Sequence, residues 1–91
     1  MDAIQALRDF FERQLSVSMP VRRHLGVGEN VSRQHVIQHL VERTIRRASV
    51  DAATQRALGP EESGTVSWEN CLMVAALTEL RPLRLLARGS V

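Results

Sequence analysis

The sequence predicts an all-α fold: a single domain over residues 1–91, built as a small bundle of four or five short helices and completed by homodimerisation. Two segments, 2–15 and 33–48, repeat their apolar residues at the three- and four-residue spacing of a helix. Polar residues that commonly cap helices stand before the expected helix starts. No segment combines two-residue alternation with β-branched enrichment, so the sequence does not call for a sheet.

The first helix is expected over residues 2–15, because its apolar residues share one face. Asp2 can cap its start, where an anion also suits the helix dipole. A second, short helix is expected to begin near Pro20, since proline suits the first turn of a helix, and to run through Leu25. Gly26 can end that helix in the left-handed conformation.

The clearest helix is expected over residues 33–48, with Ser32 as its cap. Its apolar stripe is broad enough to meet two neighbouring helices. Ser49 is expected to begin a separate short helix that Gly59-Pro60 stops. The polar, unpatterned stretch 61–65 is expected to be a loop.

The last long helix is expected to run from Trp68 to about Leu80, with Ser67 or Thr65 as its cap. Pro82 is expected to kink or restart the chain after it, because a proline inside a helix removes a backbone hydrogen bond.

Residues 71–77 are apolar all round, which is typical of a helix covered on every side. A chain this short buries only about 60–65% of its unfolded surface. The pattern therefore indicates either a central place in the bundle or an oligomer interface. The predicted oligomer interface consists of Trp68, Leu72, Met73, Leu77 and Leu80.

Two features of the sequence resemble parts of a metal-binding or catalytic site, but a purely structural role explains each of them better. His35 and His39 are four residues apart, a spacing that lets two imidazoles reach one zinc ion, with Glu42 nearby. Val36 stands where the His-Glu-x-x-His motif of metalloproteases has its glutamate, so the general base of that motif is absent. Cys71 lies inside the most apolar run, which favours a buried, inert thiol. We therefore expect no metal, no cofactor and no enzymatic activity.

The composition favours binding to another protein. All twelve basic residues are arginine, acids number ten, and the net charge of +2 is too small for strong phosphate binding. Arginine is enriched at protein interfaces, where its planar guanidinium pairs with carboxylates. We expect a small cytoplasmic regulator or adaptor that docks onto a signalling, transcription or secretion component. The predicted partner-binding residues are Arg43, Arg46, Arg47, Leu83, Arg84, Leu86 and Arg88.

A helix-turn-helix DNA-binding regulator is the alternative, with residues 33–48 as the reading helix. Arg33, Gln34 and His35 at its start would reach base edges. The turn before it spans about six residues, rather than the usual three or four.

The stretch 28–34, GENVSRQ, together with the apolar stripe that follows it, resembles a motif of small bacterial two-component-system connector proteins, the biofilm- and acid-response modulators of the AriR/YmgB type. In that family a Gly-x-Asn-apolar-Ser/Asn turn separates two helices. The similarity covers residues 12–57; the break at Pro20 and the helices after Gly59 depart from the family pattern, and these departures concern the dimer mode and the partner. The resemblance implies an all-helical homodimer that acts by binding signalling proteins.

Overall fold

The computed structural model describes residues 2–57 and 67–88, and these residues form four helices and no strand. The helices are α1 (Ala3–Gln14), α2 (Met19–Leu25), α3 (Arg33–Ala57) and α5 (Trp68–Ala87). The predicted all-α class is confirmed. The stop at Gly59-Pro60 and the loop at 61–65 lie outside the described residues.

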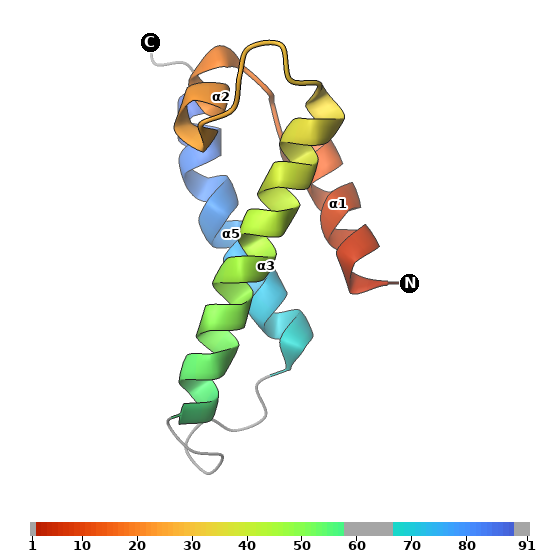
Figure 1. Ribbon diagram of the computed structural model, residues 1–91, viewed down its shortest axis with the longest axis vertical. Coiled ribbons are helices and arrows are strands. Elements are labelled where there is room, and N and C mark those ends of the chain that lie inside the picture. The colour runs from red at the N-terminus through yellow and green to blue at the C-terminus, as the bar shows by residue number, and fades with distance from the viewer. Residues whose placement is uncertain (1, 58–66, 89–91) are drawn as a thin grey trace.

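Helices α3 and α5 are the longest and run side by side in opposite directions (Figure 1). Helix α1 packs against both of them, and α2 covers one end of α5. This arrangement confirms that the apolar stripe of α3 meets two neighbours. The buried hydrophobic residues form one cluster: Leu7, Phe11, Leu15, Val21, Leu25, Val36, Ile37, Leu40, Val41, Ala48, Cys71, Leu72, Ala75, Ala76, Leu80 and Leu83.

The helix ends follow the predicted capping residues. Asp2 accepts a hydrogen bond from the Ile4 backbone N–H at the start of α1. Ser32 Oγ accepts one from the His35 N–H at the start of α3, and Ser67 caps α5 in the same way. Gly26 ends α2 with a φ of 71°, in the left-handed region that glycine adopts without strain.

The predicted break at Ser49 is wrong, because α3 continues through it to Ala57. A serine inside a helix costs only a fraction of a kcal/mol (about 0.5) relative to alanine. The helix also continues to pack, since Ala48 is buried and Ala52 packs against the core one turn later. Tertiary packing thus outweighs the capping tendency of this serine.

The predicted end of the last helix near Leu80 and its restart after Pro82 are also wrong, since α5 runs through the proline to Ala87. Proline cannot donate a hydrogen bond to the Thr78 carbonyl one turn earlier. Thr78 lies on the exposed side of the helix, where water can satisfy that carbonyl. Leu83 is buried just after the proline, so packing holds the last turns of α5 in place. None of the described helices is long and apolar enough to cross a membrane.

Candidate functional site

Helix α5 buries one face in the core and leaves large apolar side chains exposed on the other. Met73, Val74 and Leu77 are 54%, 58% and 50% exposed, and Leu85 is 63% exposed two turns later. These residues recur at helical spacing, so they form one continuous stripe with the arginines between and after them. We call this stripe the α5 face; it consists of Met73, Val74, Leu77, Arg81, Arg84, Leu85 and Arg88.

Two hollows flank the N-terminal half of the α5 face. One lies between α1 and α5, has a volume of about 180 Å³, and is lined almost entirely by apolar atoms, with Phe10 and Met73 at its walls. The other lies between α3 and α5, has a volume of about 220 Å³, and is bordered by Asp51, Asn70 and Val74. The exposed stripe is therefore bordered by recesses that side chains of a binding partner can enter.

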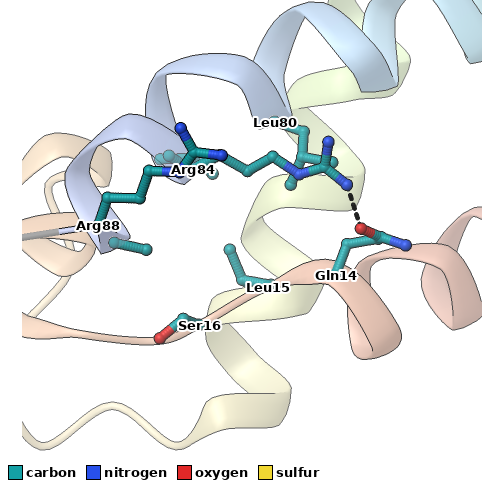
Figure 2. A pocket seen from close by; sticks show the side chains of 8 residues that line it. Gln14, Leu15, Ser16, Leu80, Arg84 and Arg88 are labelled. Atoms are coloured by element: carbon teal, nitrogen blue, oxygen red, sulfur yellow. Dashed lines mark hydrogen bonds between the residues drawn. The ribbon is translucent and has the colours of Figure 1, made fainter.

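The C-terminal half of the α5 face carries arginines beside apolar residues. A groove of about 370 Å³ is lined by Leu77, Arg81, Arg84 and Leu85 along with Leu80 and Arg88. A pocket of about 310 Å³ lies next to it, between the end of α1 and the end of α5. Figure 2 shows Arg84 reaching across this pocket to the side chain of Gln14, to which it donates a hydrogen bond.

The predicted oligomer-interface residues divide between the core and the surface. Met73 and Leu77 lie at the centre of the α5 face, and Trp68 is partly exposed at the start of the helix. Leu72 and Leu80 are instead buried against the other helices of the same chain. The part of the chain that the structure describes therefore does not cover residues 71–77 on every side, which argues against a central place in the bundle as the reason for their apolar character.

The predicted partner-binding residues near the C-terminus divide in the same way. Arg84 and Arg88 are exposed, Leu86 is half-buried, and Leu83 is fully buried. Leu85 lies within the C-terminal segment 83–88 that the sequence indicates as a contact surface, and it is the most exposed leucine of α5. It follows Leu77 by eight residues, a spacing that returns to nearly the same side of a continuous helix.

Two of the predicted partner-binding arginines on α3 bind a carboxylate within the chain. Glu79 on α5 is only 4% exposed, and its two oxygens accept hydrogen bonds from Arg43 Nε at 3.0 Å and Arg47 Nε at 2.9 Å. Both guanidinium groups remain partly open to water. Arg46 points away from the core and is exposed.

Arg33, the first residue of the proposed DNA-reading helix, also has partners inside the chain. It donates hydrogen bonds to the backbone carbonyls of Leu15 at 3.0 Å and Glu12 at 2.8 Å. Arg22 similarly donates to the carbonyls of Gly28 and Val31, in the turn before α3. These arginines hold chain segments together, so base contacts by Arg33 would require breaking its contacts with the end of α1.

Within residues 2–57 and 67–88, no three His, Cys, Asp or Glu side chains are grouped to hold a metal ion. His35 Nδ1 lies 2.8 Å from the Ser32 hydroxyl oxygen at the start of α3. Cys71 is buried, as the sequence predicted.

Comparisons of the chain with protein-family models, with curated proteins and with solved structures found no match. The function is therefore inferred from the surface of the molecule itself.

Proposed function

We propose that this chain is a small regulatory adaptor that acts by protein–protein docking, and that its bundle is completed by homodimerisation. It works in the cytoplasm and catalyses no reaction. The observation that carries this proposal is the α5 face, where a helix that packs against the other three described helices still exposes Met73, Val74 and Leu77 side by side. Exposed apolar stripes rimmed by polar residues mark interaction surfaces.

The free energy available at this surface is substantial for so small a protein. Complete burial of a valine, leucine or methionine side chain contributes about 1.5–3 kcal/mol. Since Met73, Val74 and Leu77 are each about half exposed, covering them contributes roughly 2–4 kcal/mol in total. A partner that also covers Leu85 and pairs with the neighbouring arginines gains more.

A second surface, on α3, supports docking to a different protein. Arg43, Arg46 and Arg47 lie together on this helix, with the exposed Val50 one turn further on. We call these four residues the α3 arginine surface. Glu79 offsets one of the three positive charges, which leaves an excess of two. This surface suits an acidic patch on the partner, because arginine pairs with carboxylates in a planar, two-bond geometry.

The reducing environment of the cytoplasm suits a chain whose one cysteine, Cys71, is buried and free. The roles of Arg33 and Arg22 as internal hydrogen-bond donors favour docking to protein over reading of DNA. A DNA-binding role remains the rival, and it predicts an affinity that falls steeply with salt.

Photo-crosslinking in the native cell tests the proposal. A photoreactive amino acid placed at Val74 reports what covers the α5 face, and the matched control carries it at Arg13, an exposed position near the end of α1. We expect a discrete protein adduct from position 74 and none from position 13. The mass of the adduct shows whether the occupant is a second copy or a different protein. Absence of any adduct at position 74 would overturn docking through this face.

A further inference from the structure

We infer that the occupant of the α5 face is a second copy of this chain, packed antiparallel across a two-fold axis that passes beside Leu77. This inference rests on the proposed docking function and specifies its partner. It follows from the charges at the two ends of the α5 face: acidic side chains lie beside its N-terminal end, and arginines lie at its C-terminal end.

Acidic side chains lie near the N-terminal end of the face. Glu69 is exposed in the first turn of α5, and Asp51 of α3 borders the hollow that also contains Val74. The C-terminal end carries Arg81, Arg84 and Arg88, all of them exposed. The apolar residues separate these two charged ends.

Leu77 lies midway between the charged ends. Glu69 precedes it by eight residues and Arg84 follows it by seven, which at 1.5 Å per residue is about 12 Å and 10 Å along the helix. A two-fold axis beside Leu77 therefore brings Glu69 of one copy level with Arg84 of the other. The same two-fold rotation pairs Glu69 of the second copy with Arg84 of the first, because a two-fold interface uses the same patch on both copies.

The antiparallel register is consistent with the flank of α5 on which each charged residue lies, as well as with its position along the helix axis. Two antiparallel helices related by such an axis face each other with the same flank. Glu69 lines the hollow between α5 and α1, and Arg84 reaches toward Gln14 of α1, so both lie on the α1 flank. Asp51 lies on the α3 flank, beside Val74, and the two-fold axis brings it near the level of Arg81 of the second copy.

A parallel arrangement is unfavourable on the same grounds. It would place the three arginines of one copy against those of the other, and Glu69 against Glu69. Like charges brought together across an interface oppose binding. The antiparallel arrangement avoids this repulsion and brings Leu77 of the two copies into contact, with Met73 and Val74 on either side.

Cysteine crosslinking of the purified full chain tests the register. In a Cys71→Ala background, Leu77→Cys is expected to form a disulfide-linked dimer on mild oxidation, because the two residues meet at the axis. Asn70→Cys alone and Arg84→Cys alone are not expected to link, since like positions lie about 21 Å apart along the helices and a disulfide spans less than about 7 Å between Cα atoms. A mixture of the Asn70→Cys and Arg84→Cys chains is expected to link to each other.

Charge reversal provides a second measurement that needs no engineered cysteine. Glu69→Arg is expected to weaken self-association about tenfold, and an equal mixture with Arg84→Glu is expected to restore it in the mixed dimer. Homotypic links at 70 and 84 as strong as those at 77 would show a parallel arrangement and overturn the inference. A monomeric purified chain whose position 74 links to a different protein in the cell would also overturn it, while leaving the docking function in place.

Discussion

Arg33 donates a hydrogen bond to the backbone carbonyl oxygen of Leu15 at 3.0 Å, and this contact joins residues 18 positions apart in the chain. The same guanidinium group donates to the Glu12 carbonyl. The last carbonyls of a helix lack partners within the helix, so the first residue of α3 caps the end of α1.

Replacement of this arginine by lysine tests the capping role while preserving the charge. A lysine ammonium cannot reproduce the fixed geometry in which one guanidinium reaches two carbonyls. We expect Arg33→Lys to lower the free energy of unfolding by about 1–2 kcal/mol, measured by urea denaturation. The control is Arg46→Lys, at an exposed position of the same helix, with an expected change within about 0.5 kcal/mol. Equal effects of the two variants would argue against the cap.

The end of α2 depends on the left-handed conformation of Gly26. Gly26→Ala is expected to cost about 1–2 kcal/mol of stability, although a Cβ there meets nothing within 4 Å, because the cost comes from the backbone conformation alone. Gly28→Ala is the matched control: an added Cβ makes an ordinary contact of 3.7 Å with Val31, and the backbone is not in the left-handed region. Thermal unfolding should separate the two variants, and a harmless Gly26→Ala would contradict the assignment.

Neutralising the buried carboxylate of Glu79 is expected to lower the free energy of unfolding more than neutralising an exposed carboxylate does. Glu79→Gln keeps the shape of the side chain but weakens both hydrogen bonds from Arg43 and Arg47, so we expect a loss of about 1–3 kcal/mol in urea denaturation. Glu42 is exposed and accepts a hydrogen bond from Gln38, and Glu42→Gln is expected to change stability by less than about 0.5 kcal/mol. If Glu79→Gln were as mild as Glu42→Gln, the Glu79 contacts would contribute little to the fold.

The α3 arginine surface is expected to bind an acidic partner through Arg46. Arg46→Glu reverses the charge of an exposed side chain that forms no ion pair within residues 2–57 and 67–88, and it should remove the partner proteins that wild type captures from native extract, with self-association unchanged. Arg13→Glu makes the same charge change on α1 and should leave capture intact. Partner proteins identified by mass spectrometry that remain bound to the Arg46→Glu chain would contradict the role of this surface.

The helix starts could be predicted from sequence, because the caps at Asp2, Ser32 and Ser67 act within three residues of the groups they satisfy. The continuity of the helices could not, since the packing of Ala52 and Leu83 overrides the local signals of Ser49 and Pro82.

The intramolecular contacts of the arginines also could not be predicted from the sequence. Arg47 meets a carboxylate 32 positions away, and no local pattern records such a contact. Of the candidate site, the apolar run at 71–77 was identified from composition. Which of its side chains face outward depends on where the other helices lie, so the separation of Leu72 from Met73 and Val74 needed the structure.

Our central proposal is that the α5 face binds protein and that the protein bound there is a second copy of this chain. Sedimentation of the purified chain at micromolar concentration tests this most directly. Wild type is compared with Val74→Asp and with the control Val50→Asp. Val50 is at least as exposed as Val74, but it lies on α3, outside the α5 face. We predict twice the 10.2 kDa chain mass for wild type and for Val50→Asp, and a folded species of one chain mass for Val74→Asp. A wild-type chain that stays at 10.2 kDa throughout the micromolar range would contradict the claim.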